Sequence, residues 1–226
     1  MAFQKSRKKV SEGFGNSPEG LVSEIQMLFD QLFPICRSLT GDGVRRTFDI
    51  LRTVCDFEVN SVPSGTRVFD WTVPEEWNID DAYIEDSNGH RVVSFKENNV
   101  HVVNYSTSVD AILSFNELRP RIHTLPELPT AIPYRTSYYK KDWGFCLSHE
   151  QLEQMDPNSK YHVVISSSHK LGTLNYGEAL IPGKSEQEYL ISTYCCHPSL
   201  ANDNLSGMVL WVLLLRWLKS INTDHT

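Results

Sequence analysis

A run of twelve residues, GMVLWVLLLRWL at positions 207–218, limits the folds that this chain can adopt. Leucine, valine and tryptophan would cover several faces of a helix formed by this run, and such a helix has to be buried. A membrane span needs about 20 apolar residues, and Arg216 interrupts the run before that length. The run therefore predicts a helix in the core of a globular protein.

Composition and charge exclude several classes of partner. Of the 226 residues, 40% are hydrophobic and 22% are charged, which is typical of a globular protein with a buried core. The net charge of -7 and the isoelectric point near 5.6 argue against nucleic acid or an anionic membrane as the main partner, since both favour a basic surface. A dense basic run at residues 5–9 lies in a segment, 1–19, that we expect to be a disordered N-terminal tail; an interaction arm is the alternative.

The cysteine content bears on the compartment. Five cysteines, an odd number, indicate free or metal-facing thiols rather than a disulfide framework. No apolar stretch typical of a secretory signal follows the basic start. Both features suit a reducing compartment, and we expect a cytoplasmic protein.

Residues near the start of the chain predict two helices. Apolar residues at helical spacing predict the first helix over residues 20–33, with Ser17 as its cap. The same spacing predicts a second helix over residues 43–55, capped by Thr40 or Asp42.

The middle of the chain predicts a separate β-rich module. Prolines punctuate short segments of aromatic and β-branched residues, a pattern typical of short strands joined by turns. DSNG at residues 86–89 predicts a hairpin turn, and an irregular stretch at 120–138 would cover a face of the module or add to a binding surface. We therefore predict a β-rich domain over residues 62–171, inserted into an α/β domain formed by residues 20–61 and 172–226.

Three strands are predicted to precede the apolar helix, over residues 160–168, 173–183 and 188–197. The last of them, EYLISTYCCH, lacks clean alternation, as expected of a strand covered on both faces. Ligands of open α/β folds gather beyond the carboxyl ends of central strands, so the polar residues after this strand predict a functional site.

Two possible metal ligands lie in the segment STYCCHPSLANDNLSG, residues 192–207. His197 and Asp203 have side chains that bind zinc, and a short loop could bring both to one ion. Gly207 would allow the following helix to pack closely against the strand. A lone histidine and aspartate also form ordinary hydrogen-bonded pairs in polar loops, so spacing alone leaves both interpretations open.

Four segments resemble one protein family in the same order along the chain. They are LFPICRSLTGDGVRRT, VPSGTRVFDWTVPEEWNIDDAYI, TLPELPTAIPYRTSYYKKDWGFCLSH and STYCCHPSLANDNLSG. The last resembles a segment of the co-catalytic zinc aminopeptidases, and together they resemble bacterial aminopeptidase-like proteins described as polysaccharide-biosynthesis proteins. The resemblance covers about residues 20–218. It implies an α/β fold with a zinc-aminopeptidase-like mixed sheet and flanking helices, incomplete in this chain and interrupted by a β-rich inserted domain.

The resemblance assigns roles to residues of the site. His197 matches the histidine that binds one zinc ion, and Asp203 matches the aspartate that bridges two. Related enzymes have a cis peptide bond between that aspartate and the residue that corresponds to Asn204. Ser199 stands where they have an aspartate that orients the histidine, and a hydroxyl brings no negative charge.

The resemblance also implies that the site is incomplete in this chain. In related enzymes the general-base glutamate and the remaining zinc ligands come after the apolar helix, and these 226 residues hold no such segment. The chain is then a fragment of a longer protein or a degenerate homologue.

The resemblance implies zinc-dependent hydrolysis of amide or peptide bonds, linked to polysaccharide biosynthesis, with one or two zinc ions in the complete protein. The alternative is a non-catalytic binding module that uses the same cleft, and a third hypothesis gives the insert a role in assembly with a carbohydrate-modifying complex.

Other residues could contact a substrate or a partner. Arg135 could bind a carboxylate, and Tyr138 and Tyr139 could stack on a sugar or a peptide, although ordinary packing also explains such aromatic residues. Cys195 and Cys196 would point to opposite faces of a strand, which disfavours a cysteine nucleophile. The expected partners are a peptide or a small molecule containing an amino sugar, together with either a missing C-terminal half or further copies of the chain in a homo-oligomer.

Overall fold

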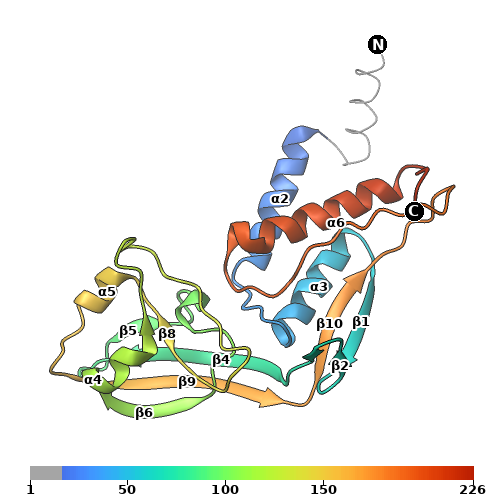
Figure 1. Cartoon of the computed structure of the whole chain (residues 1–226). Coiled ribbons are helices and arrows are strands. Elements are labelled where there is room, and N and C mark those ends of the chain that lie inside the picture. The colour runs from blue at the N-terminus through green and yellow to red at the C-terminus, as the bar shows by residue number, and fades with distance from the viewer. Residues whose placement is uncertain (1–16) are drawn as a thin grey trace. The chain divides into compact units, whose positions relative to one another are not determined.

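The computed structural model describes residues 17–226 and divides the chain into two compact units. The first unit comprises residues 17–61 and Asn175–Thr226, and the second comprises Val62–Leu174. Figure 1 traces the chain out of the first unit, through the second and back again. The basic run at residues 5–9 and most of the segment 1–19 lie outside the described residues.

The first unit contains three helices and one pair of strands among the described residues. Its elements are α2 (Pro18–Leu32), α3 (Asp42–Val54), β1 (Glu58–Pro63), β10 (Thr173–Glu178), a short helical turn (Ala201–Leu205) and α6 (Ser206–Lys219). The strands β1 and β10 pair with each other and carry the chain between the two units.

The helix starts in the first unit follow local chemistry. The Ser17 side chain accepts a hydrogen bond from the Gly20 amide, which satisfies one of the amides that a helix start leaves without a partner. Because α2 begins one residue after Ser17, residues 18 and 19 are helical rather than disordered. The predicted caps of α3, Thr40 and Asp42, were wrong. Its N-cap is Gly41, whose φ of 101° suits glycine, and Asp42 is the first helical residue.

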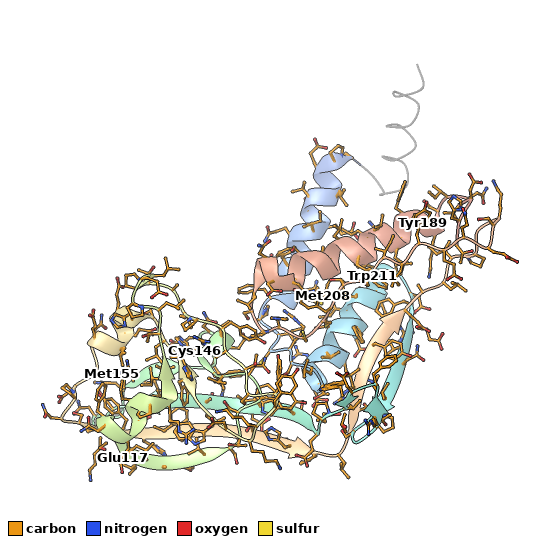
Figure 2. All side chains as sticks on the ribbon, in the orientation of Figure 1. Glu117, Cys146, Met155, Tyr189, Met208 and Trp211 are labelled. Atoms are coloured by element: carbon orange, nitrogen blue, oxygen red, sulfur yellow. The ribbon has the colours of Figure 1, made fainter. Side chains whose placement is uncertain are left out.

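The core of the first unit lies where α2, α3 and α6 meet. Its buried residues are Leu28, Leu32, Ile35, Val44, Phe48, Leu51, Phe57, Leu205, Met208, Val209, Val212, Leu213 and Leu215. Met208 and Trp211 project from α6 (Figure 2). The rings of Trp211 and Phe57 lie nearly perpendicular to each other, with their centroids 5.3 Å apart. The apolar helix is thus buried in part: five of its apolar residues are in the core, whereas Leu210 is exposed and Trp211, Leu214, Trp217 and Leu218 are half-buried. In residues 17–226 no helix is both long and apolar enough to cross a membrane.

The strand predicted over residues 188–197 is not present. This segment has no regular secondary structure, and its large side chains at Tyr189, Leu190, Ile191 and Tyr194 are exposed rather than buried. The Tyr189 amide donates to the Thr226 carbonyl, and the Trp211 indole donates to the Ile191 carbonyl. A strand needs a neighbour to pair with along its length, and no strand of the described residues pairs with this segment.

The second unit is built on a four-stranded antiparallel sheet with the order β5-β4-β9-β6. The sheet strands are β4 (Glu76–Glu85), β5 (Arg91–Ser94), β6 (Val109–Ser114) and β9 (Lys160–Lys170). The remaining elements are β2 (Arg67–Val68), β3 (Trp71–Thr72), η1 (Asn99–His101), α4 (Phe115–Leu118), η2 (Arg119–Arg121), β7 (Ile122–His123), β8 (Phe145–Cys146) and α5 (His149–Glu153). The β-rich character of this part of the chain agrees with the sequence prediction.

The second unit contains the hairpin turn predicted at residues 86–89. The predicted hairpin joins β4 to β5, and Asp86 accepts hydrogen bonds from the amides of Asn88 and His90. Gly89 closes this turn with a φ of 82°. Ser148 caps α5 and forms a capping box with Gln151.

The buried thiol of Cys146 makes the stability of the protein depend on alkaline pH. Cys146, labelled in Figure 2, lies in the second unit and is fully buried. Burial raises its pKa from 9.0 to about 12. Below pH 9 the thiol keeps its proton in the folded and in the unfolded chain. Above pH 9 the unfolded chain loses this proton, whereas the folded chain keeps it. We expect the free energy of unfolding to fall by about 1.4 kcal/mol per pH unit from this group as pH rises from 9 toward 12.

Urea unfolding of wild type and Cys146→Ala across this pH range checks this expectation. The variant lacks the thiol, so its stability should fall less steeply with pH, whatever its stability at pH 7. Equal slopes for the two proteins would contradict the assignment of an alkaline loss to Cys146.

Candidate metal-binding site

The chain turns sharply between residue 197 and the start of α6 at Ser206. The peptide bond between Asp203 and Asn204 is cis, as the family resemblance implied. The Asn204 side chain is buried and donates hydrogen bonds to the Thr193 hydroxyl and the Tyr194 carbonyl. A Cβ atom on Gly207 would lie 2.8 Å from the Thr193 hydroxyl, so this glycine permits a close approach of α6 to the preceding segment, although that segment is not the strand that was predicted. The turn is therefore tied to Thr193 and Tyr194 by the residues that follow Asp203.

This turn brings the two predicted ligands together. His197 Nε2 lies 3.7 Å from Asp203 Oδ2, although five residues separate the two in sequence. The His197 side chain is mostly buried, with 17% of its surface exposed, whereas that of Asp203 is 56% exposed. One side of the pair is thus open to solvent and to a ligand.

Tyr194 completes the environment of Asp203 and was not singled out from the sequence. Its hydroxyl donates a hydrogen bond to Asp203 Oδ1 at 2.5 Å, and its ring lies 5.3 Å from the His197 ring, centroid to centroid. The hydrogen bond to Asp203 is the main reason why the pKa of Tyr194 is raised. The contact depends on the turn at residues 198–203, so no local pattern could have indicated it.

The ring of His197 has a neighbour on its other nitrogen. Cys196 Sγ lies 3.1 Å from His197 Nδ1, whereas the Ser199 hydroxyl donates to the Phe33 carbonyl at 2.6 Å. Burial raises the pKa of Cys196 to about 11 and that of Cys195 to about 12. Both thiols therefore keep their protons at neutral pH, which disfavours a cysteine nucleophile. The earlier reason, that adjacent residues of a strand face opposite sides, does not apply because this strand is not present.

Arg37 binds the loop that follows His197, and the sequence analysis did not identify it. Its side chain is fully buried, and its guanidinium donates to the Leu32 carbonyl at 2.7 Å and to the Pro198 carbonyl at 3.2 Å. The second bond joins residues 161 positions apart and holds the backbone directly after His197. A fixed backbone at this point restricts where the imidazole can lie.

The protonation state of His197 suits metal binding. Burial lowers its pKa from the usual 6.5, the Asp203 carboxylate opposes that effect, and the Arg37 guanidinium adds to it. A histidine with a lowered pKa is neutral at pH 7, and a neutral imidazole has a nitrogen lone pair for a metal ion.

The donor pair fits part of a zinc site. Zinc bonds to histidine nitrogen and carboxylate oxygen are about 2.0–2.2 Å long, and two such bonds can span the 3.7 Å between Nε2 and Oδ2. Within residues 17–226, however, no three side chains of histidine, cysteine, aspartate or glutamate gather as a possible metal site. His197 and Asp203 could thus supply two ligands of a four-coordinate shell, and the other ligands would come from elsewhere.

The predicted substrate-contacting residues belong to the second unit. Arg135 and Tyr139 are exposed there, and the Tyr139 side chain has 86% of its surface accessible. Tyr138 is half-buried, shares a hydrogen bond with the Tyr134 hydroxyl and packs edge-on against Tyr105. The packing interpretation therefore suits Tyr138, whereas Arg135 and Tyr139 are accessible to a ligand.

Most of the chain is similar to proteins of one family. Residues 26–226 match the family described as "Domain of unknown function (DUF4910)". The chain is 49% identical over 203 residues to a Clostridium acetobutylicum protein described as "Putative polysaccharide biosynthesis protein with aminopeptidase-like domain", covering 90% of this chain and 46% of that protein. A crystal structure described as a "putative peptidase" from the same organism has a TM-score of 0.91 at 45% identity, covering 98% of this chain and 51% of that one. The chain thus spans about half the length of the relatives it matches.

Proposed function

The chain belongs to the family described as a domain of unknown function, DUF4910. Because one relative is described as having an aminopeptidase-like domain and another as a putative peptidase, we propose that the chain forms part of a zinc-dependent amide hydrolase. The proposed substrate is a peptide or a small molecule containing an amino sugar, in keeping with the polysaccharide-biosynthesis description of one relative. One or two zinc ions are the proposed cofactor of the complete protein.

The observation that carries this proposal is the pairing of His197 and Asp203. Their facing atoms lie 3.7 Å apart across a turn that contains the cis peptide bond, and Asn204 holds that turn from the buried side. At 3.7 Å the facing atoms are too far apart for a direct hydrogen bond, and two zinc-ligand bonds can span that distance. The mostly buried imidazole of His197 distinguishes this pair from His90 and Asp86, whose histidine is exposed.

Each residue of the site would have a distinct role in binding zinc. His197 Nε2 and Asp203 Oδ2 would hold zinc, and Tyr194 would keep the Asp203 carboxylate oriented through its other oxygen. Bound zinc polarises a substrate carbonyl and lowers the pKa of a bound water to about 7. The base that removes a proton from that water, and the other ligands, would be supplied from outside the described residues.

A second candidate function is a non-catalytic binding module. It is favoured by the finding that the described residues gather only two donors, which cannot fill a zinc coordination shell. In that case the same loop would bind a peptide or an amino sugar without hydrolysing it. Zinc binding and activity distinguish the two candidates.

Zinc titration of the purified chain, followed by competition with a chromophoric chelator, tests the proposed site. We expect the wild type to bind zinc and His197→Ala or Asp203→Ala to bind at least tenfold more weakly, because each removes one of two ligands. His90→Ala is the matched control. It removes an exposed histidine that lies 3.6 Å from Asp86 in the second unit, a similar pair in an unrelated hairpin.

Hydrolysis of aminoacyl and N-acetyl amino-sugar substrates is measured on the same samples. Zinc binding that is lost in both site variants and kept in His90→Ala supports the metal site. A folded wild type that binds no zinc, or binds it equally after all three substitutions, contradicts it and favours the binding module.

A further inference from the structure

Residues 184–194 are exposed, although several of their side chains are apolar or aromatic. Leu190 has 91% of its surface accessible, and Tyr189, Ile191 and Tyr194 are exposed as well. Aromatic and β-branched residues favour strands, and a soluble monomer seldom leaves a large group of apolar side chains at its surface. The segment therefore has the composition of a strand and the exposure of an interaction surface.

The backbone of the same segment is available for pairing. Among the hydrogen bonds of the described residues, none uses the backbone amides of residues 190–194. Two of the carbonyls accept from side chains: that of Ile191 from the Trp211 indole, and that of Tyr194 from the Asn204 amide group. A row of unpaired amides beside exposed apolar side chains is a template on which a strand of another polypeptide can pair.

The hydrogen bonds of Thr226 show the direction in which such a strand would run. The Thr226 amide donates to the Gln187 carbonyl at 2.9 Å, and the Thr226 carbonyl accepts from the Tyr189 amide at 2.8 Å. Thr226 is thus bonded to both neighbours of Glu188, the residue opposite it. This is the bonding pattern of parallel strands.

Helix α6 connects the two segments that Thr226 brings together. Parallel neighbours need a connection of about a dozen residues or more, and this connection is usually a helix. α6 lies between residues 187–194 and residues 224–226 in sequence, and its Trp211 indole bonds to the Ile191 carbonyl. This order is that of a βαβ unit, with residues 224–226 at the start of the second strand.

The relatives contain a candidate for the strand that would pair beyond Tyr189. This chain covers 46% of the Clostridium acetobutylicum protein and 51% of the solved structure, so each relative has about as much polypeptide again. We propose that residues 190–194 are a docking strand for this additional polypeptide, which pairs with their amides in the parallel direction that Thr226 begins. Apolar side chains of the docked strand would cover Leu190 and Ile191. The proposal holds whether or not the neighbouring loop binds zinc.

Production of two polypeptides in the same cells tests the proposal. One is the 226-residue chain, and the probe is the part of the Clostridium acetobutylicum protein that this chain does not match, carrying an affinity tag. We expect the tagged probe to retain the chain during purification. In the complex, the amides of residues 190–194 should exchange hydrogen at least about a hundredfold more slowly than in the chain alone, because they would donate to the docked strand.

Two leucine substitutions separate the docking surface from nonspecific apolar contact. Leu190→Lys places a charge on the proposed surface, and Leu171→Lys changes a leucine of the second unit that is 82% exposed. Both leucines are exposed in the chain alone, so both variants should unfold at the urea concentration of the wild type. We expect Leu190→Lys to bind the probe at least about tenfold more weakly and Leu171→Lys to stay within about twofold of the wild type.

The outcomes separate the possible occupants of this surface. Retention of the chain that is lost in Leu190→Lys and kept in Leu171→Lys supports the proposal. Failure of the probe to retain the chain, or equally fast exchange of the 190–194 amides with and without the probe, would overturn it. A dimer of the chain alone that Leu190→Lys dissociates would overturn it too, because a second copy would then occupy the surface.

Discussion

Replacing Arg37 with methionine is expected to lower the free energy of unfolding by about 3 kcal/mol. The guanidinium is fully buried and donates to the carbonyls of Leu32 and Pro198, at 2.7 and 3.2 Å. Hydrogen bonds from a charged donor contribute about 1.5–3 kcal/mol each, and methionine would leave both carbonyls without this donor. Methionine retains most of the packing of the arginine stem, so the loss reports mainly on the lost hydrogen bonds.

Urea unfolding at pH 7 measures this effect, and two further variants interpret it. Arg37→Lys keeps the charge, but an ammonium cannot reproduce the fork that reaches two carbonyls, so an intermediate loss of about 1–2 kcal/mol is expected. Arg45→Met removes an arginine in the same unit that pairs with Asp42 at the surface, and it should change stability by less than about 0.5 kcal/mol. If Arg37→Met lost no more than Arg45→Met, the buried hydrogen bonds would not stabilise the loop.

Local chemistry explains which elements could be predicted from the sequence. The spacing of apolar residues located α2, α3 and α6, and short-range side-chain contacts located the cap at Ser17 and the hairpin after Asp86. These features depend on residues a few positions apart, so the pattern that predicts them is also their physical cause. The cap of α3 was missed because Gly41 owes its place to a φ of 101° rather than to a side-chain hydrogen bond.

Long-range partners explain what the sequence could not predict. Residues 188–197 have the composition of a buried strand, yet a strand forms only where a neighbour satisfies its backbone, and composition does not report that neighbour. The contact of Arg37 with Pro198 joins positions 161 residues apart. Arginine is almost never fully buried without partners, so its position in the sequence gave no sign of its burial.

The candidate site was reached by two different routes. The resemblance to zinc aminopeptidases, rather than the spacing of residues, singled out His197 and Asp203, and the structure places their side chains 3.7 Å apart. Tyr194 was identified only from the structure, because its contact with Asp203 depends on the turn. The sequence named Cys196 only as a disfavoured nucleophile, and the structure adds its contact with the His197 ring. The metal and the roles of these residues remain proposals that the titrations decide.

Gly43→Ala is expected to destabilise the protein by about 2–3 kcal/mol, although alanine normally favours a helix over glycine by about 1 kcal/mol. Gly43 lies in the first turn of α3, and an added Cβ would lie 2.0 Å from the Cys36 carbonyl oxygen. It would also lie 3.3 Å from the Arg37 Cα. Both obstacles are backbone, so they cannot move aside without displacing the segment that carries the buried arginine.

Gly20→Ala separates this clash from helix propensity. Gly20 is an exposed residue in the first turn of α2, where alanine should leave stability unchanged or raise it by up to about 1 kcal/mol. Opposite signs for the two substitutions in urea unfolding would show that the Cys36 carbonyl leaves no space at Gly43, and equal signs would contradict the close contact. Because Arg37 holds the Pro198 carbonyl beside His197, Gly43→Ala should also weaken zinc binding, which would connect the packing of this helix start to the proposed metal site.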